Sequence, residues 1–260
     1  MKTRLIIFIH RLARWAGVEI RRATPSVPPA ITSNVLALTI SDVLLRLVSN
    51  GGRASEFTVV QIGANDGVTY DPLRRFIVKY GFRGVLVEPQ PDAFARLQKN
   101  YADLPGIAFE QAAIAETDGE KPLYRFKPGP GVPDWAGCLA SFSRATVVGN
   151  FHNVKGEVET IPVPTLTFAS LCRKHGLQHV DLLQIDTEGF DDRILKMIDF
   201  SALKPTIIEF EHGFLSATAR EECVQLLSDQ GYKVTNNGTD TVAYLEPAEQ
   251  SLVNTHVWCE

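Results

Sequence analysis

The sequence predicts an α/β fold: a doubly wound, mostly parallel sheet of seven strands with its last strand antiparallel, preceded by an N-terminal helical arm. Two observations predict this fold. From Phe57 onward, short apolar runs alternate with segments of helical periodicity, which is the pattern of βαβ units. Near the C-terminus, two strand-like runs flank Asn236, Asn237 and Gly238, a hairpin signal that places the last strand antiparallel to its neighbours.

The arm, residues 1–52, comes first. Apolar side chains recur at helical spacing over residues 5–16 with arginines and lysines around them. Such a helix either lies on an anionic membrane surface or packs on the main domain or on a partner subunit of a homo-oligomer, and packing is the commoner use. The proline-rich stretch 24–30 predicts an extended linker, and a second helix is expected over 34–49.

The main domain, residues 53–260, is expected to alternate strands and helices. The predicted strands are 57–63, 84–89, 107–114, 181–186 and 205–212, the helices are 73–80, 92–101, 191–197 and 218–230, and the hairpin is 232–247. Between Phe126 and Glu159 this alternation stops in a Gly- and Pro-rich stretch that is too long for a connector. We interpret the stretch as a substrate lid or binding wall, the alternative being an insertion without a role.

Composition excludes several functions. A net charge of -4 and a pI near 5.9 give no basic footprint for a nucleic acid. The four cysteines are scattered without a CxxC pair, so we expect reduced thiols in a cytoplasmic protein, not disulfides or a zinc site. The apolar run at residues 5–9 is far shorter than the roughly 20 residues of a membrane span. Membrane contact is therefore expected only at the periphery, through the arm.

The loop GANDG, residues 63–67, marks a candidate ligand site. Ligands of open parallel sheets bind beyond the carboxyl ends of the strands. Gly63 permits a sharp turn and Gly67 a close backbone approach, but the loop lacks the GxGxxG pattern of dinucleotide sites. Glu88, which ends the second strand, can accept hydrogen bonds from both hydroxyls of an adenosine ribose. The pattern indicates a nucleotide cofactor.

A parallel sheet that finishes in a hairpin is the usual plan of methyltransferases, and the chain resembles one of their families. The resemblance lies in six blocks, in order: VVQIGANDG, GVLVEPQPDAFARLQKNY, AAIAETDGEKPLY, VPTLTFASLC, VDLLQIDTEGFDDRIL and PTIIEFEH. Together, over about residues 57–247, they resemble the FkbM-type methyltransferases, a branch of the S-adenosylmethionine-dependent class I fold, also called Rossmann-like.

The resemblance implies a site for S-adenosylmethionine, with the ribose on Glu88 and the adenine near residues 111–113. The residues so implied are Gln61, Ile62, Gly63, Ala64, Asn65, Gly67, Glu88, Pro89, Gln111, Ala112, Ala113 and Asp186. Many family members carry an acid where this chain has Gln61, which can still hydrogen-bond the methionine end of the cofactor without pairing charges. O-methylation of a saccharide or of a polyketide-like small metabolite is the reaction that the family suggests.

Carboxylates and a histidine follow the later strands and are the catalytic candidates. Asp186 can orient the acceptor hydroxyl or the cofactor's amino group, while Glu188 either binds substrate or caps a helix N-terminus. Alternation puts Glu209 and Glu211 on one face of their strand and His212 on the other. The solution pKa of histidine, near 6.5, suits His212 as a general base, and the alternative is a structural, hydrogen-bonded histidine.

A metal-assisted reaction is a second hypothesis for the same residues. Asp186, Glu209 and His212 would hold Mg²⁺ or Mn²⁺, which would lower the pKa of the acceptor hydroxyl. The alternative functions are an NAD-type oxidoreductase and a cofactor-binding scaffold that has lost catalysis.

Two other polar pairs are expected to be structural. His175 and His179 are four residues apart, but Gly176 interrupts any helix between them, so we predict a surface turn. Asp191 and Asp192 are predicted to be a solvated helix start.

Overall fold

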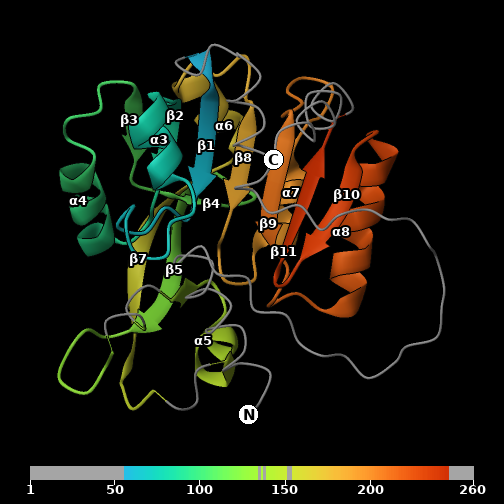
Figure 1. Ribbon diagram of the computed structural model, residues 1–260. Coiled ribbons are helices and arrows are strands. Elements are labelled where there is room, and N and C mark those ends of the chain that lie inside the picture. The colour runs from blue at the N-terminus through green and yellow to red at the C-terminus, as the bar shows by residue number, and fades with distance from the viewer. Residues whose placement is uncertain (1–55, 134–135, 137–138, 151–153, 246–260) are drawn as a thin grey trace, which may run out of the picture.

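The computed structural model describes residues 56–133, 136, 139–150 and 154–245. The predicted arm, its linker and the boundary after residue 52 lie outside the described residues. The described part forms a seven-stranded sheet with helices on both faces and a smaller four-stranded sheet below one edge of it (Figure 1).

The main sheet has the order β10-β11-β9-β8-β1-β2-β3. Its strands are β1 (Thr58–Ile62), β2 (Arg83–Val87), β3 (Ile107–Glu110), β8 (Leu182–Ile185), β9 (Ile207–Glu211), β10 (Lys233–Asn237) and β11 (Asp240–Tyr244). Only β11 pairs antiparallel, with β9 on one side and β10 on the other. The predicted doubly wound sheet, its closing hairpin and its antiparallel last strand are confirmed.

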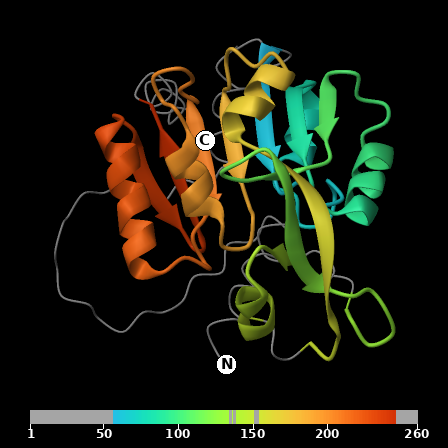
Figure 2. The ribbon, with the colours of Figure 1, turned by 180° about the vertical axis from the view of Figure 1, so that it is seen from behind.

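Helices cover the two faces of this sheet (Figures 1 and 2). Those on one face are α3 (Arg74–Tyr80) and α4 (Pro91–Asn100), and those on the other are α6 (Phe168–Lys174), α7 (Asp191–Met197) and α8 (Ala217–Asp229). Because side chains alternate along a strand, Val59 packs with α3 and α4 while its neighbour Val60 packs with α6, α7 and α8. Both residues are fully buried.

Helix ends follow local chemistry. The Thr167 hydroxyl accepts a hydrogen bond from the Ser170 N–H at the start of α6, and Ser216 caps α8 in the same way through Ala219. Helix α3 ends at Gly81, which has a left-handed φ of 68°. The helices predicted from the sequence agree with α3, α4, α7 and α8 to within two residues at each end. Helix α6, a short helix between a predicted loop and a predicted strand, was not predicted.

The second sheet was not predicted. It has the order β4-β7-β5-β6, with β4 (Ala113–Ile114), β5 (Gly119–Phe126), β6 (Ala140–Ser141) and β7 (Val158–Leu166). The single strand expected over 107–114 is wrong, because it divides at residue 111 between the two sheets. The stretch 126–159 also holds β6 and helix α5 (Arg144–Asn150), so it is not all loop. Prolines in β5 and β7, with Pro122 opposite Pro162, conceal the strand pattern.

The carboxyl ends of β1, β2 and β8 meet at the edge above the second sheet (Figure 1). Gly63 follows β1 with a φ of 86°, and its N–H donates to the carbonyl of Val87 at 3.0 Å. A Cβ at Gly63 would lie 1.9 Å from the carbonyl oxygen of Asp186. Only glycine therefore lets the chain pass between β2 and β8. Among the described residues, no helix is long and apolar enough to cross a bilayer.

We predict that Gly63→Ala lowers the free energy of unfolding far more than Gly131→Ala. Both glycines have a φ of 86°, but a Cβ at Gly131 meets nothing within 4 Å. Gly131→Ala should cost about 1–2 kcal/mol for its left-handed backbone, and Gly63→Ala should exceed it by at least about 2 kcal/mol through the steric overlap. Urea unfolding of both variants measures the difference, and equal losses would contradict the assigned contact.

Candidate active site

A cavity opens at the edge where β1, β2 and β8 end. Its lining comes from the loops after β1, β2 and β8 and from the second sheet. The lining residues are 61–65, 69–72, 88–90, 112–114, Leu123, 140–142, Gln184, 186–188 and Phe190. The cavity thus joins the loop singled out in the sequence to the sheet that the sequence did not reveal.

Most of the predicted site residues line this cavity. They are Gln61, Ile62, Gly63, Ala64, Asn65, Glu88, Pro89, Ala112, Ala113, Asp186 and Glu188. Four others, Gly67, Gln111, Glu209 and His212, do not belong to the lining. What each lining residue binds stays a prediction.

Glu88 is held rigidly at the cavity. One of its carboxylate oxygens accepts a hydrogen bond from the N–H of Asn65 and the other from the N–H of Gln90, each at 2.9 Å. The side chain is buried, and this burial raises the pKa of Glu88 to about 7. A carboxylate oxygen has two lone pairs, so both oxygens can still accept hydrogen bonds from ligand hydroxyls.

Amide oxygens form a second group of acceptors in the cavity. Gln61 and Gln184 lie directly opposite each other on β1 and β8, and both are buried. The side-chain oxygens of Gln61, Gln184 and Asn65 have no hydrogen-bond partner among the described residues. A buried acceptor without a partner costs about 1–3 kcal/mol, so these atoms are suited to a ligand that donates hydrogen bonds or carries positive charge.

Asp71 is a lining residue that the sequence reading did not assign. One of its oxygens accepts from the N–H of Leu73 at 2.7 Å and from the amide of Gln61 at 3.3 Å, and the other accepts from the hydroxyl of Tyr101 at 3.1 Å. Burial raises the pKa of Asp71 to about 6. The only signal in the sequence was an acid in the loop that follows the first strand.

The reason for Gly67 differs from the predicted one. A Cβ at Gly67 would lie 2.4 Å from the ring of Tyr101 and 2.5 Å from the side chain of Leu97. Gly67 is thus required where its loop packs on the end of α4, and it lies outside the cavity lining.

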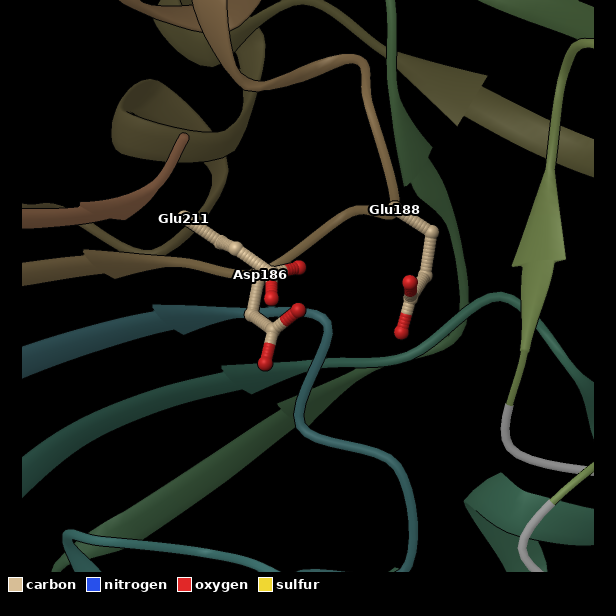
Figure 3. Close-up of side chains that lie close together, drawn as sticks. All are labelled: Asp186, Glu188 and Glu211. Carbon is tan, nitrogen blue, oxygen red and sulfur yellow. The ribbon is translucent and has the colours of Figure 1, made fainter. Parts of the chain in front are cut away.

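Three carboxylates converge at the floor of the site (Figure 3). Asp186 and Glu188 lie in the loop that follows β8, and Glu211 is the last residue of β9. One oxygen from each of the three lies within 4.8 Å of the others. Glu209 and His212, which the metal hypothesis grouped with Asp186, do not belong to this group.

Glu209, on β9, and His212, directly after it, lie outside this group. Glu209 lies two residues before Glu211, opposite Gln184, and it does not belong to the cavity lining. The ring of His212 lies 2.9 Å from the hydroxyl of Thr241. Burial and the nearby charge of Arg220 lower the pKa of His212 to about 4. The general-base role of His212 stays a prediction that its position does not support.

Asp191 is not a solvated helix start. It is fully buried, and one of its oxygens accepts from the hydroxyl of Thr187 at 2.9 Å and from the N–H of Gly189 at 3.3 Å. Burial and the negative charge of Asp186 raise the pKa of Asp191 to about 8. Asp191 thus braces the loop that carries Glu188. Phe190 is the N-cap residue of α7, two positions after Glu188, and the capping role considered for Glu188 stays a prediction.

The two histidines of HGLQH do not form a common site. The predicted surface turn is present at residues 175–176, and in it the ring of His175 is half-buried, 2.9 Å from the carboxylate of Glu110. His179 is exposed and lies 2.8 Å from Asp181. Cys172 and Cys223 are free thiols, as predicted, while Cys138 and Cys259 lie outside the described residues.

The second sheet forms one wall of the cavity. The hydroxyl of Ser141 donates to the carbonyl of Glu188 at 3.2 Å, and the ring of Phe142 meets that of Phe190 edge to face at 5.0 Å. On the other side, Arg125 of β5 donates to Gln90 at 3.3 Å and also pairs with Asp92. Part of the stretch 126–159 is therefore a wall of the cavity.

A sequence model of the methyltransferase FkbM domain matches residues 61–234, more than half of the chain. The chain belongs to the FkbM methyltransferase family. The FkbM domain spans β1 to β10 and so contains all of the cavity lining described above. The strand order, with one antiparallel strand between β9 and β10, is that of the class I methyltransferase fold expected from the resemblance.

Three of the solved structures that match the chain are named as methyltransferases. An FkbM methyltransferase from Methylobacillus flagellatus is 14% identical with a TM-score of 0.47, and the match covers 73% of this chain and 44% of that one. A precorrin-6y C5,15-methyltransferase from Geobacter metallireducens is 11% identical (TM-score 0.38; 80% and 91% covered). An RNA methyltransferase from Salinibacter ruber, in complex with S-adenosyl-L-homocysteine, is 13% identical (0.35; 81% and 92%). No curated protein matches the chain.

We predict that Glu88 makes the unfolding free energy of the ligand-free protein fall as the pH rises. Its pKa is about 7 in the folded protein against a usual value of 4.5. Its stabilising contribution is thus complete below pH 4.5 and is lost as the pH rises through 7. Urea unfolding between pH 5 and pH 8 should show a shallower decline for Glu88→Gln than for the wild type. An unchanged slope would contradict the raised pKa, because Asp71 and Asp191 titrate in both proteins.

Proposed function

We propose that this FkbM-family protein is an S-adenosylmethionine-dependent methyltransferase that methylates a hydroxyl oxygen of a saccharide or of a small metabolite. The observation that carries the proposal is the buried, preoriented carboxylate of Glu88 in a cavity that the family domain encloses. The acceptor class comes from the family resemblance together with the make-up of the cavity wall.

The residues present fit the cofactor. Glu88 can accept hydrogen bonds from two ribose hydroxyls, and the apolar side chains of Ile62, Ala112 and Ala113 can contact a flat base. The unpartnered amide oxygen of Gln61 can accept a hydrogen bond from an amino group. When bound, S-adenosylmethionine supplies a methyl group on a positively charged sulfur, which the acidic floor of the cavity favours electrostatically.

The chain's own contribution is mainly to position the acceptor. Fixed reactants can supply roughly 7–11 kcal/mol of the barrier, whereas a positioned base contributes about 10²- to 10⁴-fold. Asp186 lies at the cavity floor and can accept the hydrogen bond of the acceptor hydroxyl, whose proton must leave as the oxygen is methylated. The rings of Phe142 and Phe190 give the wall a flat apolar surface for the face of a sugar or a similar ring.

The two alternative functions are tested by ligand binding. An NAD-type oxidoreductase is not favoured, because the loop after β1 lacks the GxGxxG pattern. Calorimetric titration with NADH and with S-adenosylhomocysteine separates the two cofactors. A catalytically inactive scaffold would bind S-adenosylhomocysteine but transfer no label, so methyl-labelled cofactor incubated with a cell-envelope extract decides that question. Action in the cytoplasm near a membrane-attached glycan is part of the proposal and rests on the sequence of the arm.

We predict that Glu88→Ala weakens S-adenosylhomocysteine binding by about 10²-fold or more, because hydrogen bonds to a charged group are each worth about 1.5–3 kcal/mol. Affinity in the wild type should also rise with pH between 6 and 8, as Glu88 ionises. Glu110→Gln is the matched control, since Glu110 ends the neighbouring strand β3 without lining the cavity. Calorimetry of both variants measures the effect, and an unchanged Kd for Glu88→Ala would exclude the ribose assignment.

We predict that Phe142→Ala raises the KM for the acceptor by about tenfold, since one aromatic contact is worth about 0.5–1.5 kcal/mol beyond its buried area. Asp186→Asn should instead lower kcat by about 10²-fold or more. Both measurements use an acceptor fraction identified by methyl labelling. Retention of S-adenosylhomocysteine affinity within about threefold by Phe142→Ala is the control, and a KM unchanged by the substitution would remove the ring from the acceptor site.

A further inference from the structure

We propose that Asp186, Glu188 and Glu211, with the amide oxygen of Gln184, bind one hard divalent cation of the Mg²⁺ class at the floor of the cavity. Binding of the cation does not depend on the proposed function, but the role of the cation rests on that function. Beside Asp186, the cation would bind the acceptor hydroxyl and lower the pKa of that hydroxyl.

The spacing of the carboxylates suits a single ion. Oxygen ligands lie about 2.0–2.6 Å from Mg²⁺ or Ca²⁺, so two oxygens on opposite sides of one ion are about 4–5 Å apart. The three carboxylate oxygens lie within 4.8 Å of one another, and the side chains enter from two segments, the loop after β8 and the end of β9 (Figure 3). They therefore surround a common point instead of lying in a row along one strand.

The backbone that carries these side chains is well fixed. Ile185 of β8 lies opposite Phe210 of the neighbouring strand β9. Asp186 and Glu211 each come one residue after this pair. Glu188 has a left-handed φ of 54°, and its carbonyl accepts a hydrogen bond from the hydroxyl of Ser141. Ion sites need ligands on rigid elements, because a loose shell does not repay the cost of removing water from the ion.

Gln184 provides the independent evidence for a ligand at this place. It is 5% exposed, lines the same cavity and lies two residues before Asp186, so it points to the same face of β8. Its side-chain oxygen has no hydrogen-bond partner among the described residues. An amide oxygen is a good ligand for hard cations, and coordination would satisfy an atom that is otherwise buried at a cost.

The donor set decides the class of metal. All four ligand atoms are oxygens, from three carboxylates and one amide, with neither histidine nor cysteine among them. Oxygen-only sites select Mg²⁺, Mn²⁺ or Ca²⁺ over zinc and copper, which prefer nitrogen and sulfur. Because three of the ligands, Gln184, Asp186 and Glu188, line an open cavity, water or an acceptor hydroxyl can complete the coordination shell.

The test is titration of the full-length protein with Mn²⁺, followed by electron paramagnetic resonance and without cofactor or acceptor. Glu211→Gln should weaken Mn²⁺ binding by at least about tenfold, the loss typical of even an outer-shell change. Glu209→Gln is the matched control, because Glu209 is a buried glutamate two residues earlier on the same strand and face. It should bind Mn²⁺ within about twofold of the wild type.

Glu188→Gln repeats the test from the loop, in case the substitution on β9 prevents folding, and thermal unfolding verifies each variant. Failure of the wild type to bind Mn²⁺ at millimolar concentration, or an equal loss in Glu209→Gln, overturns the site. Affinity for S-adenosylhomocysteine is measured on the same samples. If that affinity persists without Mn²⁺ binding, the cation site fails while the proposed function stands. Mn²⁺ binding without S-adenosylhomocysteine binding supports the site and refutes the proposed function.

Discussion

The close approach of the loop after β1 to the end of β8 is the constraint on which the rest of the structure depends. The N–H of Gly63 reaches back to β2, and its Cα lies against the carbonyl of Asp186. In turn, the N–H of Asp186 donates to the carbonyl of Ile62 at 2.9 Å. This contact closes the sheet beneath the loop and sets the position of Asp186 relative to Glu88. The cavity exists because three strand ends are held at one level.

Acidic side chains around this contact determine the electrostatic potential of the cavity. Burial raises the pKa of Glu88, Asp71 and Asp191, so ionising each of them costs more free energy than ionising an exposed carboxylate. Folding alone does not favour such an arrangement, and ligands that are positively charged or rich in hydrogen-bond donors would relieve it. A sulfonium cofactor and a divalent cation both belong to that class, and they would occupy neighbouring parts of one acidic floor.

The second sheet turns an open sheet edge into an enclosed site. It touches the loops after β2 and β8 through Arg125 and Ser141, which contact Gln90 and Glu188. These are the loops that carry the residues assigned to cofactor and acceptor. The second sheet is therefore hydrogen-bonded to two of the loops that line the cavity.

The sequence by itself determined the main sheet, its closing hairpin, most of the helices and the loop that begins the site, because these follow from strong apolar periodicity and from glycines at strand ends. Glu88 and Asp186 were found because each ends a buried strand. The second sheet escaped, because prolines such as Pro122 and Pro162 weaken the pattern of its strands. Tertiary structure alone decided that Glu211, not Glu209, joins Asp186 and Glu188, and that Asp191 and His212 are buried. Those outcomes depend on how far each strand extends and on what packs against it, and neither quantity is encoded in local spacing.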